Sequence, residues 1–179
     1  VECDPELGVV DRRAKDAQEV EWLRESQRAT EGAMEMACRM VCTATARADG
    51  VLEVDGQPLT SERVRTAIDQ WLLERGYLNP VSIVAGGPQG ADCHDRGTGE
   101  LRTSETVIID IFPQNQTTYY YGDCTRTAVH GEIPDAVKRM HDVVKAAKAA
   151  GIQATRAGVT GEQVHLATKE VITREGFQM

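Results

Sequence analysis

Residues 106–127 read TVIIDIFPQNQTTYYYGDCTRT. Two segments, 106–112 and 117–129, are rich in β-branched and aromatic residues and are bounded by turn residues, which predicts two strands. A turn around residues 114–116 joins them, so we expect a hairpin. The hairpin predicts that an antiparallel sheet lies at the centre of the fold.

A carboxylate interrupts the first of these strands. Asp110 has the apolar residues 107–109 before it and 111–112 after it. The alternation of a strand places Asp110 on the same face as Ile108 and Phe112. A carboxylate on such a face is costly unless it is paired or bound to a cation.

A second carboxylate, Asp123, follows Asp110 by thirteen positions. Pairing of the two strands would bring the carboxylates close together, where like charges repel unless a divalent cation or a shared proton lies between them. Two aspartates that bridge a pair of metal ions are therefore one explanation of the interrupted strand. The alternative is that Asp110 caps a loop and that Asp123 is a surface turn residue.

Composition and charge argue against several classes of protein. The 179 residues are enough for one ordinary domain or for part of a larger one. The hydrophobic content of 41% and the charged content of 27% are typical of a globular protein. A net charge of −8 and a low aromatic content argue against nucleic acid as a partner. No apolar run approaches the ~20 residues that span a bilayer, so we expect no membrane partner.

The cysteines fit a reducing compartment better than a disulfide framework. Five are present at irregular spacing, with no CxxC pair: Cys3, Cys38, Cys42, Cys93 and Cys124. An odd number without a pairing pattern is typical of free thiols and favours a cytoplasmic location. Cys38 and Cys42 are four residues apart, which places them on one face of a helix. We expect both to act as small buried hydrophobic residues.

Before the hairpin, the pattern predicts two helices and a short strand. Apolar periodicity predicts a long helix over residues 13–47, and residues 48–59 are typical of a loop or small hairpin. Thr60 caps a second helix that ends near Arg75. Residues 81–85 are a short apolar strand, which a glycine-rich turn follows.

Two more helices follow the hairpin. Pro134 opens the first, which runs to Gly151. Its predicted apolar face consists of Val137, Met140, His141 and Val144. Thr160 and Gln163 form a capping box for the second. The order of elements predicts an α+β fold in which helices pack on one face of an antiparallel sheet, and no domain boundary is evident within residues 1–179.

The motif YYYGDCTRT at residues 119–127 resembles the signature gYxxDxTRT of the creatinase/prolidase group of metallopeptidases, which share the pita-bread fold. The strand around Asp110 resembles the one that carries this family's first metal-binding aspartate, and His94 resembles its substrate-binding histidine. Residues 156–160 and 11–25 resemble two further segments of the catalytic domain. The TRT form favours relatives of aminopeptidase P and prolidase over methionine aminopeptidases.

The resemblance implies a metal-dependent peptidase that cleaves N-terminal or Xaa-Pro peptide bonds, with a peptide substrate as its partner. It implies two divalent metal ions that Asp110 and Asp123 hold in part. Mn²⁺ is the first choice of ion, and Co²⁺ or Zn²⁺ are the alternatives. His94 would bind the substrate or the reaction intermediate. Thr125 would orient a metal ligand from the second layer of contacts.

The chain departs from the family pattern in two ways. The spacing between Asp110 and Asp123 is longer than is usual, which predicts a longer hairpin. The family's remaining ligands, a histidine in a GHG motif and two later glutamates, do not occur before Met179. We therefore expect the first half of a catalytic domain, inactive alone, that associates with its second half or forms a homo-oligomer. The competing hypothesis is a non-catalytic pita-bread relative that binds peptides or proteins.

The remaining histidines and the glycine-rich run have structural interpretations. His130, His141 and His165 do not lie where the family has ligands, so they are interpreted as ordinary core or surface residues. The run GGPQG at residues 86–90 lacks the Lys-Ser/Thr of a phosphate-binding loop, which favours a simple turn.

Overall fold

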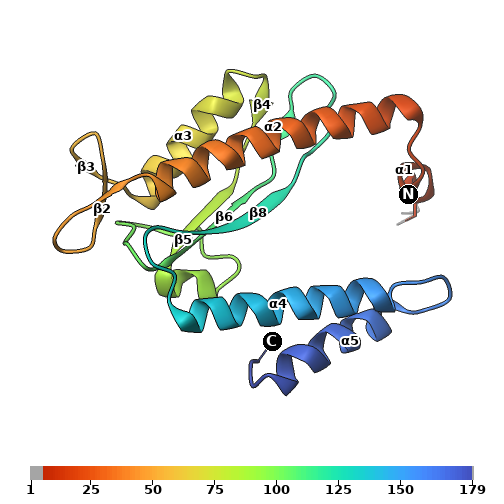
Figure 1. The fold of residues 1–179 in the computed structure, drawn as a ribbon. Coiled ribbons are helices and arrows are strands. Elements are labelled where there is room, and N and C mark those ends of the chain that lie inside the picture. Colours follow the sequence, from red (N-terminus) through yellow and green to blue (C-terminus); the bar gives the residue numbers. More distant parts are fainter. Residues whose placement is uncertain (1–5, 179) are drawn as a thin grey trace, which may run out of the picture. The chain divides into compact units, whose positions relative to one another are not determined.

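The computed structural model describes residues 6–178 (Figure 1). The chain divides into two compact units, and the division falls between Glu132 and Ile133. All strands of the described residues lie in the first unit, and the second unit is a pair of helices. Across residues 6–178, none of the helices has the combination of length and hydropathy that a bilayer span requires.

The first unit begins with a short helix, α1 (Val9–Arg13), and a long helix, α2 (Ala17–Cys42). The prediction of one helix over residues 13–47 is therefore wrong at both ends. A capping box starts α2, because the Asp16 side chain accepts the Glu19 N–H at 2.8 Å and the Glu19 carboxylate accepts the Asp16 N–H at 2.8 Å.

A small antiparallel sheet follows α2. It consists of β1 (Thr45–Ala46), β2 (Leu52–Val54) and β3 (Gln57–Pro58), in that order. The pairing of β1 with β2 takes residues 45–46 out of the predicted helix. The pairing of β2 with β3 confirms the small hairpin that was expected over residues 48–59.

Helix α3 (Ser61–Leu73) begins at the predicted cap. The Thr60 hydroxyl accepts the Arg63 N–H at 3.2 Å. The helix ends at Leu73 rather than near Arg75, which is within the usual uncertainty of helix ends.

The central sheet is antiparallel and has the strand order β5–β6–β8. Its strands are β5 (Ser82–Gly86), β6 (Thr106–Ile111) and β8 (Cys124–Val129). A separate strand pair joins β4 (Tyr77–Leu78) to β7 (Gln114–Asn115). The strand predicted at residues 106–112 is confirmed. Residues 114–115, predicted as the apex of the hairpin, instead belong to a second ladder.

The segment between β7 and β8 is a folded loop, so the strand predicted over residues 117–129 is wrong in its first half. The Asn115 side chain accepts the N–H groups of Thr117 and Thr118 at 2.9 and 3.0 Å, which closes a tight turn. Tyr119 has a left-handed backbone with φ 62°, which is incompatible with a strand. These local bonds replace ladder bonds along the aromatic run.

One face of the central sheet carries the hydrophobic core. Val107, Ile109 and Ile111 of β6 are fully buried there. They form one cluster with apolar residues of α2 and α3, which lie on that face (Figure 1). The alternate residues of β6, Asp110 among them, lie on the other face and are half-buried. This arrangement confirms the predicted α+β fold with helices on one face of an antiparallel sheet.

A hydrogen bond ties the loop before β8 to the start of α2. The Tyr120 hydroxyl donates to the Glu19 carboxylate, and the Tyr120 ring packs against Trp22 with ring centroids 5.7 Å apart. The bond from Tyr120 is the main cause that lowers the pKa of Glu19 from its ordinary value of 4.5. The same bond is the main cause that raises the pKa of Tyr120 from 10.0 to about 12.

We expect this bond to make stability depend on pH at both extremes. Folding lowers the pKa of Glu19, so its contribution is present above pH 4.5 and is lost as the pH falls through the folded-state value. Folding raises the pKa of Tyr120, so its contribution is present below pH 10.0 and is lost as the pH rises toward 12. Thermal unfolding should therefore separate the wild type from Tyr120→Phe between these limits, and the two should converge outside them.

The matched control is Tyr119→Phe, because Tyr119 is 69% exposed. We expect this variant to follow the wild type across the whole pH range. A difference between wild type and Tyr120→Phe that stays constant with pH would contradict the prediction.

The second unit is a helical hairpin of α4 (Asp135–Ala154) and α5 (Gly161–Arg174) (Figure 1). The predicted capping box of α5 is confirmed. The Thr160 hydroxyl accepts the Gln163 N–H at 3.2 Å, and the Gln163 side chain accepts the Thr160 N–H at 2.8 Å.

The predicted apolar face of α4 is wrong. The buried residues of α4 are Val143, Ala147 and Gly151, one on each successive turn. A Cβ at Gly151 would lie 2.8 Å from Thr168 Oγ1 of α5, so this stripe of small residues lets the two helices approach closely. Of the residues predicted for the face, Val137 is half-buried, whereas Met140, His141 and Val144 are exposed. Gly151 lies within the helix rather than at its end.

Candidate metal and substrate site

The central sheet aligns two of the candidate residues across its open face. Asp110 on β6 pairs with Ile83 on β5 and with Thr125 on β8. The three residues therefore form a row on one face of the sheet. The Thr125 hydroxyl donates a hydrogen bond to Asp110 Oδ1. This bond holds the Asp110 carboxylate in one orientation.

A cavity of about 280 Å³ lies over this row. Its floor consists of alternate residues of the three strands: Ile83, Ala85, Ile108, Asp110 and Thr125. Its wall includes Gly90, which lies in the short helix η1 (Gly87–Ala91). A Cβ at Gly90 would lie 2.8 Å from Ile108 Cδ1, so the wall lies directly on the floor. The glycine-rich run thus forms a short 3₁₀-helix rather than the simple turn that was predicted. The cavity places the Asp110 carboxylate among apolar side chains.

Asp123 lies directly before β8, just outside the ladder that pairs Asp110 with Thr125. The alternation of β8, continued by one residue, predicts the face of Thr125 for the Asp123 side chain. The backbone N–H of Asp123 donates to Gln27 Oε1 of α2 at 3.1 Å. Asp123 is exposed and does not line the 280 Å³ cavity.

His94 lies beside the cavity wall and not in the lining itself. Its N–H donates to Asp92 Oδ1 at 2.8 Å, and its Nδ1 lies 3.6 Å from Cys93 Sγ. Asp92 and Cys93 do line the cavity, opposite Asp110. Sequence reasoning missed these two residues, and the one signal available was their place directly before His94.

The donor set fits a hard divalent cation in part. Asp110 and Asp123 supply carboxylate oxygens, which Mg²⁺ and Mn²⁺ prefer. Asp92, Cys93 and His94 form a cluster of potential metal ligands. One ligand atom from each lies within 4.8 Å of the others, and within residues 6–178 this is the cluster of three or more such residues. Asp110 and Asp123 lie outside that cluster. Within residues 6–178 they therefore provide only some of the ligands that a metal site needs.

The geometry of His130 supports its structural interpretation. Its Nε2 lies 2.8 Å from the Ala44 carbonyl oxygen, and its Nδ1 lies 2.9 Å from Thr103 Oγ1. These bonds join the residue after β8 to the segment that follows α2 and to the loop before β6. His141 and His165 are exposed on α4 and α5.

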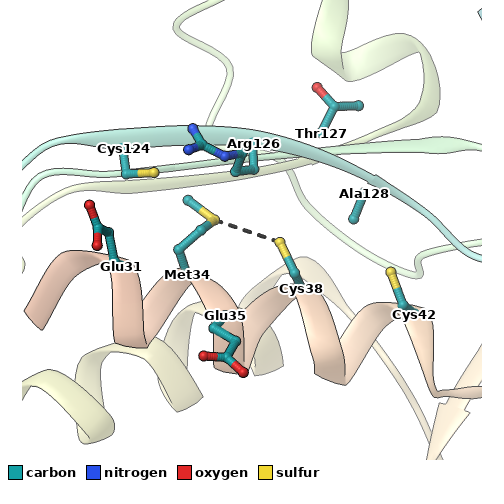
Figure 2. Close-up of a pocket in the computed structure, with 9 residues that line it drawn as sticks. All are labelled: Glu31, Met34, Glu35, Cys38, Cys42, Cys124, Arg126, Thr127 and Ala128. Carbon is teal, nitrogen blue, oxygen red and sulfur yellow. Dashed lines mark hydrogen bonds between the residues drawn. The ribbon is translucent and has the colours of Figure 1, made fainter. Parts of the chain in front are cut away.

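A second cavity, of about 400 Å³, lies between α2 and β8 (Figure 2). Three cysteines line it, Cys38 and Cys42 from α2 and Cys124 from β8. Burial is the main cause that raises the pKa of the Cys38 thiol, and its Sγ lies 3.7 Å from Met34 Sδ. The prediction that both helical cysteines are buried is wrong for Cys42, which is exposed in the last turn of α2, and Cys38 is only half-buried. The four described cysteines are free thiols, as predicted, and Cys3 lies outside the described residues.

The sequence is similar to known peptidases. The chain is 33% identical over 126 residues to a probable dipeptidase PepE of Mycobacterium tuberculosis, which covers 66% of this chain and 32% of that protein. It is 31% identical over 128 residues to Xaa-Pro aminopeptidase 1 of Streptomyces coelicolor, which covers 69% of this chain and 26% of that protein. These alignments span a third or less of each relative's length.

The fold is similar to solved structures over nearly the whole chain. X-Pro aminopeptidase from Thermotoga maritima matches with a TM-score of 0.78 and 24% identity, over 97% of this chain and 46% of that one. Dipeptidase PepE from Mycobacterium ulcerans matches with a TM-score of 0.73 and 26% identity, over 95% and 43%. The predicted pita-bread type of α+β fold is thus confirmed. The model of metallopeptidase family M24 matches residues 21–179, and the chain belongs to that family.

Proposed function

We propose that this chain is the first half of the catalytic domain of a metal-dependent peptidase that cleaves N-terminal or Xaa-Pro peptide bonds. The observation that supports the proposal is the pairing of Asp110 with Thr125 beside a cavity, with Asp123 two residues before Thr125 in the sequence. The names of the similar proteins, a probable dipeptidase and an Xaa-Pro aminopeptidase, support the same class of reaction.

Each candidate residue has a distinct proposed role. Asp110 and Asp123 would hold two divalent ions together with ligands from outside this chain segment. Mn²⁺ is preferred over Co²⁺ or Zn²⁺ as the ion. Such ions, when bound, polarise a scissile carbonyl and lower the pKa of a bound water. Thr125 would keep the Asp110 carboxylate oriented through its hydrogen bond. His94 would donate a hydrogen bond to the substrate carbonyl as negative charge develops on it.

The proposed partners are a peptide and a second stretch of polypeptide. The peptide would occupy the cavity beside Asp110. The remaining metal ligands would come from a later part of the same protein or from another copy of the chain. In the part of the chain that the structure describes, β8 is at the edge of the central sheet, and strand edges of this kind favour pairing with further backbone. We keep the cytoplasmic location, which the cysteine content favours, as part of the proposal.

The test uses the longest form of the protein that contains this sequence. Hydrolysis of Xaa-Pro dipeptides is measured after addition of Mn²⁺, for the wild type and for Asp123→Asn. We expect the substitution to lower activity by roughly 100-fold or more, because it removes a charged ligand and keeps the side-chain shape. Asp55→Asn, in the exposed turn between β2 and β3, is the control and should keep full activity.

The outcomes separate the two function hypotheses. Equal activity of the wild type and Asp123→Asn would remove Asp123 from the mechanism. A wild-type protein that binds the peptides without hydrolysing them, with or without Mn²⁺, would favour the non-catalytic binding module.

A further inference from the structure

We propose that Asp92, Cys93 and His94 form a binding site for a thiophilic divalent cation such as Zn²⁺, separate from the Asp110–Asp123 pair. The three residues offer a carboxylate oxygen, a thiolate sulfur and an imidazole nitrogen, and these atoms lie within 4.8 Å of one another. Zinc binds this combination of atoms with bonds of about 2.0–2.3 Å. The ligand atoms therefore need to close only modestly around a central ion.

Two contacts hold the three residues close together. The backbone N–H of His94 donates to Asp92 Oδ1 at 2.8 Å, and the imidazole Nδ1 of His94 lies 3.6 Å from Cys93 Sγ. When a cation binds, the Cys93 thiol loses its proton to solvent and the neutral imidazole offers a nitrogen lone pair. The cation then lies between the Cys93 sulfur and the His94 nitrogen, in place of the thiol proton.

The backbone of the site is anchored on both sides. The Asp92 N–H donates to the Gln89 carbonyl at 3.2 Å, and the Asp95 N–H donates to the Asp92 carbonyl at 3.2 Å. One residue further, the Arg96 carbonyl accepts the Val84 N–H of β5 at 3.1 Å. A backbone fixed in this way loses little conformational entropy when its side chains bind an ion.

Cys93 differs from the other described cysteines. Cys38, Cys42 and Cys124 line the cavity between α2 and β8 (Figure 2), and no histidine lines that cavity. No three candidate ligand atoms there lie within 4.8 Å of one another, as far as residues 6–178 are concerned. Cys93 is exposed and adjoins an imidazole and a carboxylate, so a cation reaches three different ligands at once.

The site has a consequence for the cavity beside it. Asp92 and Cys93 line the same cavity as Asp110, and His94 as a zinc ligand is no longer available to a substrate. Mn²⁺ prefers oxygen ligands, whereas a thiolate favours zinc, so the two sites select different ions. We therefore expect excess zinc to inhibit the peptidase, and this consequence, unlike the binding itself, rests on the proposed function.

Titration of the metal-free protein with Co²⁺ tests the binding directly. A Co²⁺–thiolate bond produces a charge-transfer absorption band that carboxylate and imidazole ligands do not produce. We expect the band to saturate at one equivalent, to disappear when Zn²⁺ is added, and to be absent in Cys93→Ser. His94→Gln should weaken the affinity by roughly tenfold or more. Cys42→Ser, at the exposed cysteine of the other cavity, is the matched control and should keep the band.

An absent band in the wild type, or a band that survives in Cys93→Ser, overturns the site. The second measurement uses the Mn²⁺-activated longest form, and each variant is compared with its own activity before Zn²⁺ is added. Added Zn²⁺ should lower this relative activity in the wild type and much less in Cys93→Ser. Equal inhibition of the two by Zn²⁺ overturns the inhibitory role. A protein that binds Co²⁺ through Cys93 but has no peptidase activity contradicts the proposed function and leaves the zinc site standing.

Discussion

Gly97→Ala is expected to lower the free energy of unfolding by about 4 kcal/mol. Gly97 is buried and has φ 74°, a left-handed backbone that costs an L-residue about 1–2 kcal/mol. A Cβ there would lie 1.8 Å from the Val84 carbonyl oxygen and 2.8 Å from Ala85 Cα. Both atoms belong to the backbone of β5, which cannot move without loss of its ladder to β6. Overpacking of this kind adds about 1–3 kcal/mol.

Gly99→Ala separates the two costs. Gly99 has φ 77°, and no atom lies within 4 Å of a Cβ built on it. Its substitution should therefore cost only the left-handed term, about 1–2 kcal/mol. Urea denaturation of both variants gives the comparison. Equal losses of stability in the two variants would contradict the close approach of Gly97 to β5.

Gly97→Ala should also weaken the proposed cation site. The segment that carries Asp92 and His94 returns to β5 at Arg96, whose carbonyl accepts the Val84 N–H. A displaced Gly97 moves this anchor, so we expect a lower Co²⁺ affinity in the fraction of protein that stays folded. The cobalt titration described for Cys93→Ser provides the measurement.

Sequence reasoning predicted those elements in which a local rule and the core agree. Thr60 and Thr160 begin helices because each side chain accepts the backbone N–H three residues later. The strand at residues 106–112 was predicted because alternating β-branched residues suit both a pleated backbone and one buried face. Asp110 stood out for the same reason, since it alone breaks that pattern.

Sequence reasoning was wrong where side chains made local bonds or where packing was tight. The aromatic run before β8 has strand propensity, but the Asn115 side chain closes a turn there instead. On α4, Gly151 and its small neighbours are buried because α5 approaches closely. Periodicity of large apolar residues does not report such a contact.

The wall of the candidate site depends on a contact between distant parts of the chain. Asp92 and Cys93 line a cavity with Asp110 because the segment after β5 folds back over the open face of β5 and β6. No spacing rule connects these residues. The sequence indicated Gly90 only as one residue of a predicted turn. Its lack of a side chain is what allows the segment of residues 87–91 to pack directly against Ile108.

Gly122→Ala is expected to cost about 3 kcal/mol, the upper end of the usual overpacking range. Gly122 is buried where the chain passes α2, directly before Asp123. A Cβ there would lie 2.1 Å from Thr30 Oγ1 and 2.5 Å from the Ser26 carbonyl oxygen. The Thr30 hydroxyl donates to that same carbonyl at 2.7 Å, so neither atom is free to give way. The substitution should push Asp123 away from α2.

A double-mutant cycle with Thr30→Ala tests which atom opposes the new methyl group. Removal of the Thr30 hydroxyl relieves one contact, whereas the Ser26 carbonyl remains at 2.5 Å as part of the α2 backbone. We expect Thr30→Ala to recover only about 1 kcal/mol of the loss caused by Gly122→Ala. Gly161→Ala, with no atom within 4 Å of its Cβ, is the control and should leave stability nearly unchanged. Full recovery in the double variant would show that the hydroxyl alone holds Gly122 and Asp123 in place. Partial recovery is the result expected if the α2 backbone holds Gly122 and Asp123 in place.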